Sequence, residues 1–191
     1  MGGARPEGKL MKMAASEIVA FWLQAGPAKW FEKDPAFDET IRARFLTYVE
    51  AALGGQLGEW MESDQGALAL VLVLDQFTRN IWREDARAFS GDEIALACAQ
   101  DAIGQGVDLR LSEVERRWLY MPFMHSERLE AQKAGMVYFS TRLDDPNTLA
   151  YAQLHLDIAE RFGRFPHRNQ LLGRETSEAE QAFLDDGGFK G

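Results

Sequence analysis

The segment 161–174 concentrates positive charge. It contains four arginines and one histidine but no acidic residue, although the whole chain carries a formal charge of −9. Two explanations are open. The arginines can brace helix C-termini and acidic neighbours through their planar guanidinium groups. Alternatively, Arg164, His167 and Arg168, which surround Pro166, can bind an anion where a helix N-terminus offers free N–H groups and a favourable dipole.

A second group of polar residues lies at the end of an apolar stretch. Asp75 and Arg79 are four residues apart, so they share one face of a helix. Charged side chains are rarely buried unless they are paired. The two residues therefore form either an internal ion pair that sets the register of the helix or the border of an interior pocket.

A third group lies in residues 119–127, where Pro122 interrupts an aromatic and methionine-rich run. A proline leaves helical backbone groups without partners, and His125, Ser126 and Glu127 can supply hydrogen bonds to them. Ser126 is also suited to cap the N-terminus of the next helix.

The histidines of the chain are His125, His155 and His167. His155 shares a helical face with apolar residues, which indicates a core histidine with a hydrogen-bond partner. No metal-ligand spacing such as His-Glu-x-x-His occurs, and neighbouring arginines would repel a cation. We therefore expect no metal site and no cofactor.

Candidate nucleophiles lack an activating context. Ser126 and Ser177 do not lie in a Gly-x-Ser-x-Gly motif, and Cys98 has no basic neighbour that would lower its pKa. Cys98 is the single cysteine of the chain, so no internal disulfide can form. A free thiol in an alanine-rich stretch indicates a reducing compartment, and we expect a cytoplasmic protein.

The elements that must position these residues are helical. Ser and Asp caps, Asp-Pro pairs and Ser-x-x-Glu capping boxes precede amphipathic segments, and no hairpin signal occurs. We expect an all-α fold, an antiparallel array of about eight helices, in which Pro122 ends or kinks one helix. The expected helices cover about residues 16–26, 34–54, 65–80, 92–104, 112–122, 126–143, 145–163 and the residues from Ser177 on. Asp92 is the expected N-cap of the helix over residues 92–104.

The helix expected over residues 65–80 differs from the others. Its leucines, valines and Phe77 cover every face, so this helix should be central and surrounded. A buried strand is the alternative for its valine-rich middle. We favour a helix because the run continues to Asn80 without turn residues.

Length and charge limit the remaining possibilities. A chain of 191 residues suits one helical domain, which we place at 16–191 after a flexible leader at 1–15. The net charge argues against a nucleic-acid partner, because such binding requires many lysines and arginines. The longest apolar run, 67–74, is too short to cross a membrane. The oligomeric state stays open.

Three motifs resemble an uncharacterised bacterial family, domain of unknown function 924. The motifs are residues 74–83 together with 87–89, residues 120–127 and residues 161–169. The resemblance implies a tetratricopeptide-like helical fold and implies no activity. Thr78 stands where the family pattern has proline, a difference expected to alter only the local end of that helix.

Two functions from different classes follow from these residues. The first is a binding module for a small anionic ligand or an acidic peptide; the second is a metal-independent hydrolase or transferase with His125 or His167 as general base. A histidine beside a carboxylate in a closed pocket would favour the enzyme, and mutually satisfied polar residues would favour the module. The candidate ligand-binding residues are Asp75, Arg79, His125, Glu127, His155, Arg164, His167 and Arg168.

Overall fold

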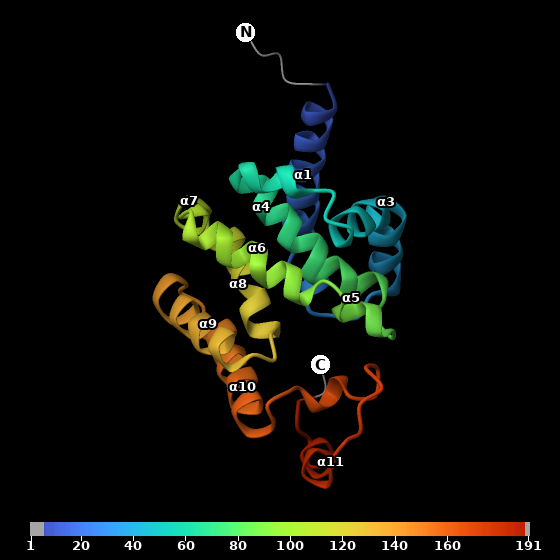
Figure 1. Ribbon diagram of the computed structural model, residues 1–191, viewed down its shortest axis with the longest axis vertical. Helices are drawn as coiled ribbons and strands as arrows, with labels where there is room; N and C mark the ends of the chain where they lie inside the picture. Colours follow the sequence, from blue (N-terminus) through green and yellow to red (C-terminus); the bar gives the residue numbers. More distant parts are fainter. Residues whose placement is uncertain (1–5, 190–191) are drawn as a thin grey trace. The chain divides into compact units, whose positions relative to one another are not determined.

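The computed structural model describes residues 6–189, with side chains from Ala14 on. Within these residues it contains helices and no strand, so the predicted all-α class is confirmed (Figure 1). Eight of the α-helices in the described part have eight or more residues, as expected. The α-helices are α1 (Pro6–Ala25), α2 (Pro27–Trp30), α3 (Pro35–Leu53), α4 (Asp64–Val71), α5 (Thr78–Ile81), α6 (Asp92–Gly104), α7 (Val107–Arg110), α8 (Glu113–His125), α9 (Leu129–Arg142), α10 (Pro146–Phe162) and α11 (Glu178–Asp185).

The chain divides into two compact units. Unit 1 comprises the residues up to Arg83 together with Arg87–Pro122, and unit 2 comprises Glu84–Ala86 together with the residues from Phe123 on. Short 3-10 turns join the longer helices: η1 (Gly58–Glu62) and η3 (Ala86–Phe89) precede α4 and α6, and η4 (Pro166–Arg168) follows α10. None of the described helices is long and apolar enough to cross a membrane.

One continuous helical segment forms the centre of unit 1. It consists of α4, the π-helical segment η2 (Leu72–Phe77) and α5. Helices α1, α3 and α6 pack around it, and every residue of η2 is buried. The prediction of a surrounded central helix is therefore confirmed, and the strand alternative is wrong. Sequence reasoning did not predict the π-helical turns, which are rare and often accompany functional or strained sites.

A close backbone approach accompanies the π-helical segment. The carbonyl of Leu74 lies so near Gly91 that a Cβ atom there would overlap it. The hydroxyl of Thr78 donates to the same carbonyl at 2.8 Å. Gly91 is therefore required by the packing of the chain that enters α6 against η2.

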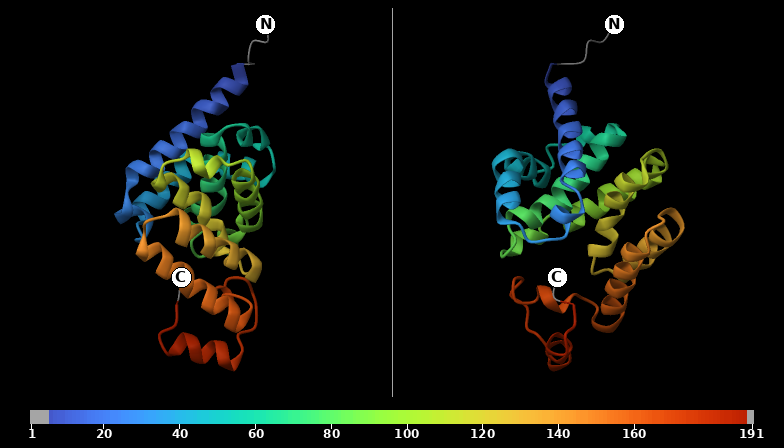
Figure 2. Two further views of the ribbon diagram at one scale, coloured as in Figure 1. Left: turned by 90° about the vertical axis from the view of Figure 1, so that its left-hand side faces the viewer. Right: turned by 180° about the vertical axis from the view of Figure 1, so that it is seen from behind.

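Unit 2 is built on a helical hairpin. Helices α9 and α10 pack along each other and are joined by residues 143–145 (Figure 2). Gly135 permits close packing in this unit, because a Cβ atom there would lie 2.7 Å from the Phe123 Cβ. Helix α10 ends at Phe162 and is capped by Gly163, whose φ of 69° is the left-handed conformation that favours glycine. The chain then forms η4 and α11, which contact each other.

Four of the predicted helix starts are confirmed by their hydrogen bonds. Before α8, the Ser112 N–H donates to Glu115 Oε2 at 3.0 Å and the Glu115 N–H donates to the Ser112 hydroxyl oxygen at 3.4 Å, as a capping box requires. The side chain of Asp34 accepts from the N–H groups of Ala36 and Phe37, and that of Asp145 accepts from Asn147 and Thr148. Ser177 and Glu180 form the predicted reciprocal capping box at the start of α11. These caps satisfy N–H groups that no helical carbonyl can reach.

Other predicted boundaries are wrong. Helix α1 begins at Pro6 rather than Ser16, and residues 1–5 of the expected leader lie outside the described residues. Asp92, the expected cap of α6, is instead its first residue, and the cap position is occupied by Gly91. The Asp92 carboxylate binds Arg79. Helix α9 begins at Leu129 rather than Ser126, whose hydroxyl oxygen instead accepts from the N–H of Arg128 at 3.2 Å.

The sequence predicts that Pro122 ends or kinks its helix. Helix α8 continues past Pro122 to His125, so the first of these two alternatives is wrong. Its last turn has partners that the local sequence does not reveal. The Gln132 side-chain amide donates to the carbonyls of Met124 and Ser126 at 2.6 and 2.7 Å. Such bonds satisfy carbonyls that have no partner within the helix.

Candidate functional site

The candidate residues Asp75 and Arg79 lie in unit 1. Asp75 is fully buried on η2, and its Oδ1 accepts from Arg79 Nη1 at 3.3 Å, while its Oδ2 accepts from Gln76 Nε2 at 2.5 Å. Arg79 also binds Asp92, with 2.9 Å between Nη2 and Oδ1. Burial opposes the charge of Arg79, but Asp92 and Asp75 outweigh it and raise the pKa of the guanidinium. The predicted internal ion pair is therefore present.

In unit 2, Glu127 connects the loop before α9 to the segment that follows α10. Its Oε1 accepts from the Phe165 N–H at 2.8 Å and from Arg174 Nη2 at 2.9 Å, and its Oε2 accepts from Arg174 Nη1 at 2.8 Å. Burial opposes ionisation of Glu127, but these hydrogen bonds outweigh it and lower its pKa. The fork of Arg174 thereby holds the Phe165 backbone against this loop.

A second arginine–glutamate pair fastens α11 to the end of α10. Arg164 donates to Glu180 through Nε at 2.6 Å and through Nη2 at 2.8 Å, and Nη2 also donates to the Glu175 carbonyl at 2.8 Å. Glu180 is 3% exposed. The hydrogen bonds from Arg164 outweigh the effect of burial and, with those from Ser177, lower the pKa of Glu180 to about 2.

Arg168 is a buried cation of unit 2. It is 6% exposed and lies over the ring of Phe165, 4.7 Å from the ring centroid. Its Nη2 donates to the His125 carbonyl at 2.9 Å. The guanidinium thus contributes a cation–π contact and a capping bond to the last residue of α8. Its charge also contributes to the lowered pKa of Glu127.

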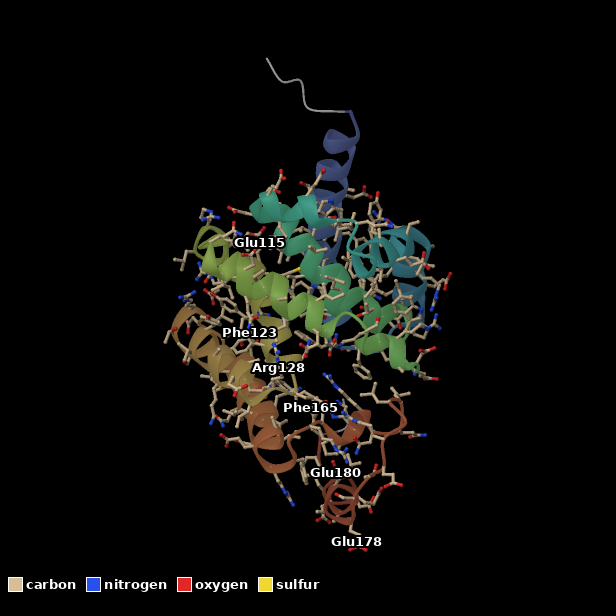
Figure 3. The ribbon with its side chains drawn as sticks, in the orientation of Figure 1. Glu115, Phe123, Arg128, Phe165, Glu178 and Glu180 are labelled. Atoms are coloured by element: carbon tan, nitrogen blue, oxygen red, sulfur yellow. The ribbon has the colours of Figure 1, made fainter. Side chains whose placement is uncertain are left out.

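Aromatic and imidazole rings gather around Phe165, and we call these rings the histidine–phenylalanine cluster. The cluster comprises His125, His155, Phe165, His167 and Phe189. Ring centroids lie 6.5 Å apart for His125 and His155, 5.3 Å for His155 and Phe165, and 5.7 Å for Phe165 and His167. Figure 3 labels Phe165 on the segment that follows α10. The rings come from the end of α8, from α10, from the segment that contains η4, which carries both Phe165 and His167, and from the residue that follows Gly188.

His155 is the most constrained imidazole of this cluster. It is 6% exposed, and its Nδ1 donates to the Tyr151 carbonyl at 2.8 Å. This bond defines the orientation of the ring. The prediction of a core histidine with a hydrogen-bond partner is therefore confirmed.

The predicted site residues fall into two sets. Unit 1 holds Asp75 and Arg79, and unit 2 holds His125, Glu127, His155, Arg164, His167 and Arg168. Sequence reasoning missed Arg174 and Glu180 as ion-pair partners and Phe165 and Phe189 as ring partners. The Ser177–Glu180 capping box predicted a role for Glu180 at the start of a helix but not its ion pair with Arg164. No local pattern predicted the ring contacts of Phe189.

The chemistry available in unit 2 is hydrogen-bond donation and positive charge beside apolar rings. Imidazole N–H groups and a guanidinium bind carboxylates and phosphates by charge-assisted hydrogen bonds. Among the residues described, no group of three or more His, Cys, Asp or Glu side chains has the arrangement of a metal site.

The fold and these residues define an all-α protein with an arginine- and histidine-rich C-terminal unit. Residues 18–188 match the family described as "Bacterial protein of unknown function (DUF924)", and the chain belongs to this family. The solved structure of a protein of unknown function, ATU0120 from Agrobacterium tumefaciens, is 42% identical in sequence. The match covers 93% of this chain and 99% of that one, with a TM-score of 0.89. No curated protein matches the sequence.

Proposed function

We propose that the protein is a binding module for a small anionic ligand or an acidic peptide, held in unit 2 by Arg168 and the imidazoles of His125, His155 and His167. The observation that carries the proposal is the convergence of these four nitrogen-bearing side chains on Phe165 and its neighbours. Guanidinium and imidazole groups beside apolar rings recognise an anion through short, charge-assisted hydrogen bonds.

The pairing of the neighbouring carboxylates supports a binding module over an enzyme. Glu127 is held by Arg174, and Glu180 is held by Arg164. A histidine that acts as general base in a hydrolase or transferase is commonly oriented by a carboxylate. Here both glutamates are engaged by guanidinium groups, so they brace the segment that carries His167 and Arg168.

Thermal unfolding with added anions tests the proposal. Phosphate, sulfate and citrate are compared with sodium chloride at matched ionic strength. A ligand that binds only the folded state adds about 2.7 kcal/mol of stability at a concentration 100 times its Kd, so the melting temperature should rise with concentration. A wild-type melting temperature indifferent to all three anions would contradict the proposal.

Two charge-matched variants locate the response. Arg168→Gln removes the positive charge that lies over Phe165 and retains an amide that can donate to the His125 carbonyl. Lys133→Gln removes the same charge from α9, where Lys133 is 58% exposed and pairs with Glu160 at 3.6 Å. The anion response should disappear in the first variant and persist in the second. Equal loss in both would indicate nonspecific charge screening.

Two further properties belong to this proposal. The α9–α10 hairpin is the kind of unit that tetratricopeptide-like folds stack, which supports a tetratricopeptide-like description of the helical array.

The thiol of Cys98 is in no disulfide, and burial, with Asp101, raises its pKa. An unreactive free thiol supports a cytoplasmic location.

A further inference from the structure

We infer that the histidine–phenylalanine cluster of unit 2 binds the aromatic ring of a ligand at the position that the Phe189 ring occupies in the structure. The inferred ligand is an aryl carboxylate, which displaces Phe189 when it binds. The anionic part of this inference rests on the proposed function. The inference that the ligand carries an aromatic ring rests instead on the ring contacts of Phe189, which the proposed function does not use.

Phe189 lies between two histidines. Its ring centroid is 4.7 Å from that of His155 and 5.2 Å from that of His167, and the interplanar angles are 64° and 83°. Both are edge-to-face contacts, the arrangement that aromatic rings favour. Phe165 completes the surroundings, because its ring makes an edge contact with His155 at 83° and a stacked contact with His167 at 22°. His155 and Phe165 are buried, whereas Phe189 is only partly buried.

The backbone before Phe189 returns from α11 toward the cluster. Gly187 has a φ of 84°, which places it in the left-handed region, and the Gly188 N–H donates to the Phe183 carbonyl at 2.9 Å. A Cβ atom at Gly188 would overlap Phe183. Phe183 in turn packs its ring against Phe162 of α10, with 5.2 Å between centroids. The turn is therefore anchored at Phe183.

Phe189 itself lies beyond this anchor and outside any regular element. No backbone hydrogen bond of a helix or sheet has to break when its ring leaves the cluster. Displacement therefore costs the ring contacts with His155 and His167, and a ligand that supplies an aromatic ring restores them.

Arg168 supplies the second half of the ligand's chemistry. Its guanidinium lies over Phe165, on the ring that also contacts His155 and His167. Phe165 is thus a shared neighbour of Arg168 and of the two histidines that contact Phe189. The carboxylate of the aryl ligand is assigned to Arg168, because arginine binds carboxylates through a planar fork. An aliphatic acid offers the charge without the edge contacts, and a neutral aryl alcohol offers the ring without the charge.

Calorimetric titration with benzoate tests the inference on wild type, Phe189→Ala and Phe31→Ala. Phe31 lies in unit 1 and is 64% exposed, so its variant is a control that loses a phenyl ring outside the cluster. If the tail occupies the site about nine-tenths of the time, its removal should strengthen benzoate binding about tenfold. Phe31→Ala should bind benzoate like wild type. No gain in Phe189→Ala, or an equal gain in both variants, would overturn the inference.

Three further probes separate this inference from the proposed function. Cyclohexanecarboxylate and benzyl alcohol should each bind Phe189→Ala less tightly than benzoate. If phosphate stabilises the wild type and Phe189→Ala gains nothing for benzoate, the proposed function stands and the aryl ligand is wrong. If benzyl alcohol equals benzoate and no anion raises the melting temperature, the anionic ligand and the proposed function are both wrong.

Nuclear magnetic resonance of the wild-type protein gives an independent readout that does not depend on a variant folding. Displacement moves the Phe189 ring out of the cluster, so benzoate should shift the ring signals of Phe189, and the benzoate protons should show nuclear Overhauser contacts to the imidazoles of His155 and His167. Phe189→Leu, which keeps an apolar side chain but loses the ring current, should shift the imidazole signals of both histidines without ligand. Unchanged signals at saturating benzoate would overturn the inference.

Discussion

Arg174 holds both carboxylate oxygens of Glu127, with 2.8 Å from Nη1 to Oε2 and 2.9 Å from Nη2 to Oε1. The two residues are 47 positions apart. The same carboxylate accepts from the Phe165 N–H, so one side chain fixes the path of the chain that carries His167 and Arg168. The order of the cluster in unit 2 therefore depends on an ion pair outside it.

Glu127→Gln should destabilise unit 2 by about 2 kcal/mol, because the charge-assisted fork to Arg174 is lost in a partly buried setting. Urea unfolding followed by circular dichroism measures this loss. Glu160→Gln is the matched control, since Glu160 is exposed and its pair with Lys133 should contribute less than about 0.5 kcal/mol. Equal losses in the two variants would show that the Glu127 fork does not stabilise the fold.

Glu180 should make stability depend on pH between about 5 and 2. The pKa of Glu180 in the folded protein is about 2, below its ordinary value, which it has in the unfolded chain. The contribution of Glu180 to the free energy of unfolding is therefore complete above the unfolded pKa and is lost as the pH falls toward 2. Glu180→Gln should lower the melting temperature at pH 7 and flatten the profile across this window. Glu178→Gln changes an exposed residue on the same helix and should retain the wild-type profile. Parallel profiles for wild type and Glu180→Gln would refute this expectation.

Two glycine substitutions in and before α6 should have opposite effects. Gly91→Ala places a methyl group against the Leu74 carbonyl and should cost about 2–3 kcal/mol, because neither backbone can easily move. Gly104→Ala meets no atom within 4 Å and should stabilise by up to about 0.5 kcal/mol through lower unfolded-state entropy. Denaturant midpoints measure both. A neutral Gly91→Ala would mean that the chain before α6 is free to shift away from η2.

Local patterns in the sequence were sufficient for the helical architecture. Asp34, Asp145 and the Ser177–Glu180 pair each form caps with backbone groups two or three residues away, so their spacing alone predicts the helix starts. The burial of residues 68–77 followed from apolar side chains on every face. The Asp75–Arg79 pair followed from a separation of four residues.

Only the tertiary structure decided which residues make the site in unit 2. Glu127 and Arg174 lie far apart in sequence, and a basic segment does not reveal whether a carboxylate or a ligand meets each arginine. Phe189 contacts His155 and His167 because Gly187 and Gly188 turn the chain back after α11. Helix caps and periodic burial depend on neighbours within a few residues, whereas these contacts depend on the path of the whole chain. For that reason the sequence by itself determined the helices, and the fold determined the partners of their charged and aromatic side chains.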